Sequence, residues 1–228
     1  MYNLNLEWIL LIVIGVVGIV VQWRLQSVFK KYSKVLLPDG LTGREIAEKM
    51  LRQNGVAGVK VVSTPGRLTD HYNPKDNTIN LSEAVYNQAS IAAAAVAAHE
   101  TGHAIQHAQN YAPVKLRSAL VPVIQFTSMW SFWVIIAGMV LINTFPALFW
   151  IGIGMIACSA LFALVTLPVE FNASARAMEW LRQSHTLEGQ ALVQARSALS
   201  WAASTYLVAA LSAIATLLYY LSIGRSRN

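Results

Sequence analysis

Charged side chains are scarce in this 228-residue sequence and are missing from two long parts of it. Only 12% of the residues are Asp, Glu, Lys or Arg, whereas 55% are hydrophobic, which excludes an ordinary soluble globular protein. No charge occurs in the 52 residues 118–169 or in the 28 residues 197–224. Because a membrane-spanning helix needs about 20 apolar residues, the first stretch predicts two spans and the second predicts one.

Cysteine is nearly missing as well. The single Cys158 lies in a predicted span, so it excludes a disulfide within the chain and is interpreted as a small apolar filler. The net charge of +6 comes without an interleaved Arg/aromatic patch or a recognised nucleic-acid module, so no nucleic acid is expected as a partner. The basic excess is interpreted as a signal of membrane topology, aided by anionic lipid headgroups.

The N-terminal apolar run, residues 8–21, lacks the basic residues that precede the core of a secretory signal. Residues 1–7 contain no Lys or Arg, while Arg24 and three lysines between residues 30 and 34 follow the run. This asymmetry predicts an uncleaved anchor whose N-terminus lies outside the cell and whose C-terminal flank is cytoplasmic. Arg225 and Arg227 count against this orientation, because it places the C-terminus outside, but the cytoplasmic segments hold more basic residues.

These patterns predict a mainly α membrane protein with about four transmembrane helices, at residues 8–22, 120–142, 147–167 and 202–221. The expected segments are an N-terminal anchor (1–23), a cytoplasmic α+β part (24–118), a transmembrane hairpin (119–167), a helical segment (168–200), and a C-terminal transmembrane helix with its tail (201–228).

The cytoplasmic part carries several local signals. Thr42 and Glu45 have the spacing of a capping box at a helix start, and Gly55 is placed to end that helix. Residues 59–62 and 78–81 read as strands, which we expect to form a short β-hairpin. Ser82 is the expected N-cap of the next helix, over residues 82–110.

The most informative motif is His99-Glu100-Thr101-Gly102-His103, an HExxH sequence within that alanine-rich helix. Residues four apart lie on one face of a helix, so both imidazoles can reach a single cation. Glu100 then lies beside the metal, where it can take a proton from a water molecule that the metal activates. The motif favours a zinc peptidase site over two ordinary histidines of a helix.

A catalytic zinc ion needs a third protein ligand. His107 continues the spacing, but on an unbroken helix it lies about 12 Å from His99, too far to share the ion. The longer HExxHxxGxxH pattern is absent, because Gln106 and Gln109 occupy its glycine and last histidine positions. The predicted spans hold no acid that could serve. Glu170, the first charge after the neutral stretch, remains, either as a ligand or as an ordinary acid where a span ends.

Three stretches together resemble a known family, the YugP-type neutral zinc metallopeptidases of prokaryotic membranes. They are residues 99–107 (HETGHAIQH), residues 170–177 (EFNASARA) and residues 68–74 (LTDHYNP). That family in turn resembles the HtpX-like membrane proteases, whose zinc is held by two HExxH histidines and a glutamate on a later helix. An aspartate follows that glutamate by four residues in the HtpX-like motif. Here the position is Ser174, a weaker hydrogen-bond partner for a ligating histidine.

The resemblance implies a zincin-like fold for the α+β part and a gluzincin-like metalloendopeptidase with one catalytic Zn²⁺ ion. It implies His99, His103 and Glu170 as the metal ligands and Glu100 as the general base. The chain is thus expected to hydrolyse peptide bonds at the cytoplasmic face of a prokaryotic plasma membrane. The alternative function is a non-catalytic zinc-binding membrane adaptor, or a subunit of a membrane protease complex.

A further donor to the developing oxyanion is expected. The candidates are His71, Tyr72, Arg176 and His185, and the spacing secures none of them, since each also fits an ordinary turn, ion-pair or loop role. The expected partners are a polypeptide substrate, which could itself be a membrane protein, the lipid bilayer, and a membrane protease complex or a second copy of the chain.

Overall fold

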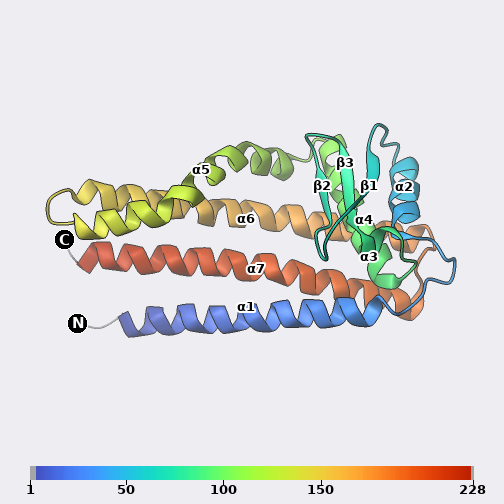
Figure 1. Cartoon of the computed structure of the whole chain (residues 1–228), viewed down its shortest axis with the longest axis horizontal. Coiled ribbons are helices and arrows are strands. Elements are labelled where there is room, and N and C mark those ends of the chain that lie inside the picture. Colours follow the sequence, from blue (N-terminus) through green and yellow to red (C-terminus); the bar gives the residue numbers. More distant parts are fainter. Residues whose placement is uncertain (1–3, 227–228) are drawn as a thin grey trace. The chain divides into compact units, whose positions relative to one another are not determined.

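The computed structural model describes residues 4–226, and it is mainly helical with one small sheet (Figure 1). Residues 1–3 of the expected anchor and residues 227–228 of the expected tail, including Arg227, lie outside the described residues. The helices are α1 (Leu4–Tyr32), α2 (Gly43–Gln53), α3 (Glu83–Tyr86), α4 (Ile91–Ala108), α5 (Ala112–Val140), α6 (Pro146–Gln183) and α7 (Gly189–Ser226). The strands are β1 (Lys60–Thr64), β2 (His71–Asn73) and β3 (Thr78–Ser82).

The chain divides into two compact units, and the first consists of Met1–Val20, Lys115–Leu167 and Thr205–Asn228. Within the described residues, four helices are long and apolar enough to cross a membrane: Trp8–Tyr32, Ala112–Val140, Pro146–Gln183 and Gly189–Arg225. Each of the four predicted spans overlaps one of them, so the prediction of a mainly α membrane protein is confirmed. Large apolar side chains of this unit, such as Phe132 and Trp133, are exposed, as side chains that face lipid would be.

The second unit consists of Val21–Val114 and Pro168–Ser204. Its first short helix, α2, begins as the sequence predicts. The Thr42 hydroxyl accepts a hydrogen bond from the Glu45 N–H, and the Glu45 carboxylate accepts one from the Thr42 N–H. Gly55, at φ +68°, follows its last turn. Buried side chains of α2, β3, α4 and the end of α6 form one core, which includes Ile46, Ile79 and Leu181.

The expected hairpin is wrong in its strand pairing. β1 and β3 lie where strands were predicted, but they pair in parallel and therefore cannot form a hairpin. The antiparallel partner of β3 is β2, which the sequence pattern did not reveal because three residues are too few to show alternation. The strand order β1-β3-β2 makes β2 an edge strand.

The expected helix from Ser82 to residue 110 is interrupted. Ser82 makes no capping hydrogen bond through its side chain, α3 ends at Tyr86, and α4 starts only after Ser90, whose hydroxyl accepts from the Ala93 N–H. Residues 88–91 instead form backbone hydrogen bonds with residues 35–43: Leu37 N–H to Ala89 O, Gly43 N–H to Gln88 O, and Ile91 N–H to Val35 O. These hydrogen bonds to a distant part of the chain replace the helical ones. No local signal in the sequence indicates this replacement.

Helix α6 does not end at the predicted membrane boundary. It continues through Pro168 to Gln183, although a proline inside a helix removes one hydrogen bond of the ladder. Residues 146–167 of this helix belong to the first unit, and residues 168–183 belong to the second. Glu170 is therefore placed by a continuous helix and not by a separate segment.

Candidate metal centre

Helix α4 brings the two histidines of the HExxH motif together. Their Nε2 atoms are 3.2 Å apart, and their ring centroids are 4.7 Å apart. Both side chains are nearly buried, with 12% of His99 and 11% of His103 exposed. The turns of α4 before the motif carry wholly buried alanines, whose small side chains let neighbouring elements approach the helix closely.

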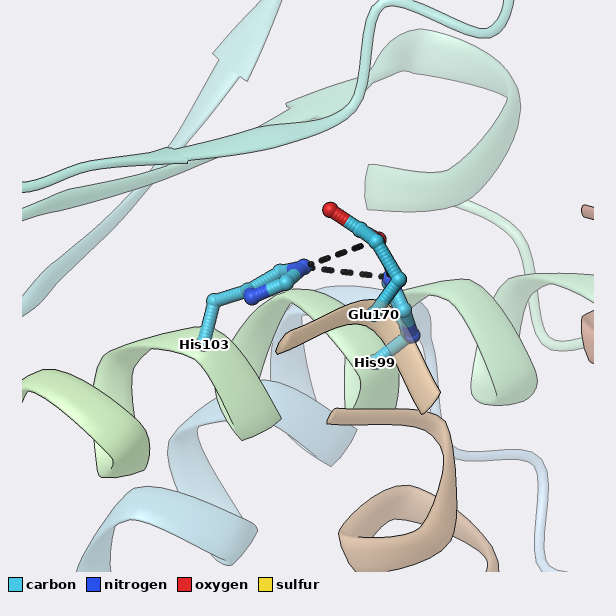
Figure 2. Close-up of side chains that lie close together, drawn as sticks. All are labelled: His99, His103 and Glu170. Atoms are coloured by element: carbon cyan, nitrogen blue, oxygen red, sulfur yellow. Dashed lines mark hydrogen bonds and ion pairs between the residues drawn. The ribbon is translucent and has the colours of Figure 1, made fainter. Parts of the chain in front are cut away.

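Glu170 reaches the same place from α6, as Figure 2 shows. Its Oε2 atom lies 3.4 Å from His99 Nε2 and 3.5 Å from His103 Nε2. The close approach of the two helices depends on Gly102, because a Cβ atom there would lie only 2.7 Å from the Ala173 carbonyl oxygen. A glycine inside the motif and an alanine one turn after Glu170 thus bring the carboxylate to the imidazoles.

The spacing of these three atoms fits a tetrahedral zinc ion. With Zn–N and Zn–O distances of about 2.0–2.1 Å, two ligand atoms of a tetrahedron lie about 3.3 Å apart. The three observed separations are 3.2, 3.4 and 3.5 Å. Glu170 Oε2 is buried, and among the described residues it has no hydrogen-bond partner; only the two imidazole nitrogens face it. Two imidazoles and one carboxylate are also the ligand set of a catalytic zinc site with one position left open.

Each histidine has a polar partner at its other ring nitrogen. Ser174 Oγ lies 3.1 Å from His99 Nδ1, and Gln106 Oε1 lies 3.1 Å from His103 Nδ1. Ser174 was expected in this role, whereas Gln106 was considered only as the residue that breaks the longer zinc motif. Its signal was available, since residue i+3 shares a helix face with His103. Asn172, which contacts Gln106, lies in the stretch 170–177 that carries the family resemblance, but no role of its own was expected for it from the sequence.

Glu100 is 8% exposed and is held by the edge strand. Its Oε2 atom accepts a hydrogen bond of 3.1 Å from the backbone N–H of Tyr72 in β2. The Tyr72 phenol points elsewhere: its hydroxyl donates to Asn77 Oδ1, and its ring packs against His107. Burial raises the pKa of that phenol. Tyr72 therefore reaches the site through its main chain.

The other three candidates for the oxyanion donor make their hydrogen bonds and ion pairs with residues other than His99, His103 and Glu170. His71 is exposed, and its Nδ1 faces the Thr69 carbonyl at 2.8 Å. Arg176 donates from Nε to Asn172 and from Nη1 to Gln109, both at 2.7 Å. His185 is exposed and pairs with Glu188. The structure thus gathers His99, Glu100, His103, Glu170 and Ser174, together with the main chain of Tyr72.

Burial and neighbouring charges shift the pKa values of His103 and Asp70. Burial alone would lower the pKa of His103, but its contact with Glu170 and the charges of Glu100 and Glu170 outweigh burial and raise that pKa. Burial raises the pKa of Asp70, and the neighbouring charge of Glu100 adds to the increase. Hydrogen bonds from the Ser82 N–H (2.7 Å) and hydroxyl (3.2 Å) favour the Asp70 carboxylate and partly oppose this shift.

Known proteins are similar to this chain in sequence. A family model described as "Putative neutral zinc metallopeptidase" matches residues 7–225. The chain is also 41% identical over 212 residues to the "Putative membrane protease YugP" of Bacillus subtilis (strain 168), which covers 91% of this chain and 92% of that protein. No solved structure matches the chain. The resemblance seen in the sequence is confirmed, and the chain belongs to the family of neutral zinc metallopeptidases.

Proposed function

We propose that this protein hydrolyses peptide bonds with one zinc ion held by His99, His103 and Glu170, and with Glu100 as the general base. The observation that carries the proposal is the triangle of ligand atoms, whose sides of 3.2, 3.4 and 3.5 Å match the edges of a tetrahedral zinc site. When bound, zinc supplies a Lewis acid that polarises the scissile carbonyl and acidifies water.

Glu100 performs the proton transfers in this proposal. Its carboxylate takes a proton from the attacking water and later delivers it to the amine nitrogen that leaves. The Tyr72 N–H holds one carboxylate oxygen in place, so the base is oriented before substrate arrives. The intact carboxylate also favours an enzyme over a zinc-binding adaptor, because a purely structural site does not need a general base.

We propose that the substrate binds in an extended conformation along the edge strand β2. β3 is paired on both sides, whereas β1 and β2 lie at the two ends of the described sheet, and β2 is the end strand that contacts Glu100. The Tyr72 N–H points to the outer edge of β2, since it donates to Glu100 and not to β3. An extended polypeptide that pairs with β2 would lie beside the general base.

The proposed location is a prokaryotic plasma membrane, crossed several times, with the site on the cytoplasmic side. The basic residues after the first apolar run support this orientation. In a chain whose Cys158 is replaced by Ala, a cysteine introduced at Lys34 should then react with a membrane-impermeant maleimide only after cells are opened. The proposed partners are a polypeptide substrate, which could be a membrane protein, and a protease complex or a second copy of the chain.

Glu100→Gln tests the mechanism. Glutamine keeps an acceptor for the Tyr72 N–H but cannot take a proton, so cleavage of dye-quenched casein should fall by about 10²–10⁴-fold. Zinc content, measured on the purified full chain, should stay unchanged. The matched control is Glu48→Gln, a surface residue paired with Arg44, which should cleave normally. Equal turnover by Glu100→Gln would refute the proposed base, and a wild-type protein that binds zinc but cleaves nothing would favour the adaptor.

A further inference from the structure

Gln106 is a wholly buried amide between the two ligand-bearing helices. Its Nε2 donates to the Val169 carbonyl at 2.8 Å and to Asn172 Oδ1 at 3.0 Å. Its Oε1 lies 3.1 Å from Nδ1 of His103. One side chain of α4 therefore contacts a metal ligand of its own helix and two residues of α6 that flank Glu170.

The direction of each hydrogen bond follows from the donors and acceptors present. The Arg176 guanidinium can only donate, so the Asn172 atom that it contacts at 2.7 Å must be the oxygen. That oxygen and the Val169 carbonyl can only accept, so both must face the amide nitrogen of Gln106. The amide oxygen is then left for His103, and it requires a proton on Nδ1.

A neutral His103 with its proton on Nδ1 has its lone pair on Nε2, the atom that faces His99 and Glu170. The partner of His99 imposes no such choice, because the Ser174 hydroxyl both donates and accepts. The two histidines thus differ: the surroundings fix the tautomer of His103 and leave that of His99 open.

We propose that Arg176, Asn172 and Gln106 form a positioning chain that presents Nε2 of His103 to a divalent cation. The proposal rests on the proposed function only in assuming that the three ligands hold zinc. Arg176 stands at one end of this positioning chain, and its Nη1 atom donates to Gln109 at 2.7 Å. This role replaces the contact with the oxyanion that was considered from the sequence. Loss of such hydrogen-bond partners typically weakens metal affinity about 10- to 100-fold.

A simpler explanation is that these polar groups only fasten α4 to α6. Fastening would affect the stability of the metal-free protein, whereas positioning affects the affinity for the ion. The two explanations therefore predict different changes in two separate measurements, the melting temperature without metal and the dissociation constant for zinc.

The test uses four variants of the full chain purified in detergent: Gln106→Met, Asn172→Ala, Arg176→Gln and Gln53→Met. Methionine has nearly the length of glutamine but neither donates nor accepts strongly. Gln53→Met is the matched control, because it also removes one side-chain hydrogen bond from this unit, the 2.8 Å bond with Trp180, without touching the ligands or their partners. Zinc affinity is measured by competition with a chromophoric chelator, and Co²⁺ absorption reports the ligand geometry.

We expect zinc affinity to fall about 10- to 100-fold in Gln106→Met, by a smaller factor in Asn172→Ala and least in Arg176→Gln, with a change of less than about twofold in Gln53→Met. Unchanged affinity in both Gln106→Met and Asn172→Ala would overturn the proposal, even if their melting temperatures fall. If Gln106→Met does not fold, the zinc affinity of Asn172→Ala still decides the question, because Asn172 is only half-buried and its replacement is less disruptive.

A measurement on the wild type needs no variant. With ¹⁵N-histidine and added zinc, the metal-dependent shift of His103 should fall on its Nε2 atom, and a shift of its Nδ1 atom to the metal-bound range would overturn the proposal. These readouts are independent of turnover. A protein that binds zinc as expected but cleaves no peptide would refute the proposed function while leaving the positioning chain intact.

Discussion

Gly102→Ala tests whether the close approach of α4 to α6 sets the metal site. An alanine Cβ at this position would lie 2.7 Å from the Ala173 carbonyl oxygen and 3.2 Å from its Cα. Both neighbours are backbone atoms, so no flexible side chain can move aside. To restore an ordinary contact of 3.4 Å, the two helices must separate by roughly 0.7 Å at this point.

A separation of that size exceeds the tolerance of a zinc site, in which ligand distances hold within about 0.2 Å. Glu170 lies one turn before Ala173, so its carboxylate moves away from the two imidazoles with the helix. We expect zinc affinity to fall at least about tenfold, which corresponds to about 1.4 kcal/mol. The metal-free protein should lose about 0–2 kcal/mol of stability, because overpacking costs about 1–3 kcal/mol and the higher helix propensity of alanine offsets about 1 kcal/mol of that.

The assay is chelator competition for zinc together with thermal unfolding of the metal-free chain. Gly154→Ala is the matched control, because it is the same substitution in helix α6 at a position with no atom within 4 Å of the new Cβ. It should leave zinc affinity unchanged. If Gly102→Ala binds zinc as tightly as the wild type, the reasoning that ties the site to this helix contact is refuted.

Three other changes have distinct expected results. Glu170→Gln should weaken zinc binding roughly a hundredfold or more while the metal-free chain stays folded; full zinc occupancy would mean that another residue is the third ligand. Because the pKa of His103 is raised above its ordinary value of 6.5, this residue stabilises the metal-free fold fully below that pH, and the stabilisation is lost as the pH rises through the raised pKa. Zinc must displace the same proton, so the affinity for zinc should increase as the pH rises through that window. Melting curves of the metal-free protein and zinc titrations at several pH values check both trends. A stability that rises with pH, or a zinc affinity that falls with pH, would contradict them. Asp70→Ala removes two hydrogen bonds to Ser82 that tie the start of β2 to the end of β3, and it should cost about 1–3 kcal/mol and raise KM; a raised KM without a lower melting temperature would contradict the structural explanation.

The sequence was most informative where a single element decides the geometry. The spacing of His99 and His103 on one helix requires only helical periodicity, and the structure places their Nε2 atoms 3.2 Å apart. The capping box at Thr42 and Glu45 is equally local, and it is present as predicted. The apolar stretches identified, for the same reason, the four helices of the described part of the chain that are long and apolar enough to cross a membrane.

Contacts between distant elements could not be predicted in this way. Gln106 and Asn172 are 66 residues apart, and no pattern along the chain indicates that they meet. The interruption between α3 and α4 depends on hydrogen bonds with residues 35–43, and the short edge strand β2 depends on its pairing with β3. The sequence offered Glu170 as a third ligand only through its isolation after a neutral stretch and through the family resemblance, and an ordinary interfacial acid would have looked the same.

The division of the ligands between α4 and α6 has a consequence for biosynthesis. The two histidines are translated more than 60 residues before the glutamate, with all of α5 between them. A nascent or truncated chain that ends before residue 170 has two of the three ligands and lacks the contact that aligns them. If these three residues hold the ion as proposed, the metal site cannot be completed until α1, α5 and the apolar part of α6 have been made.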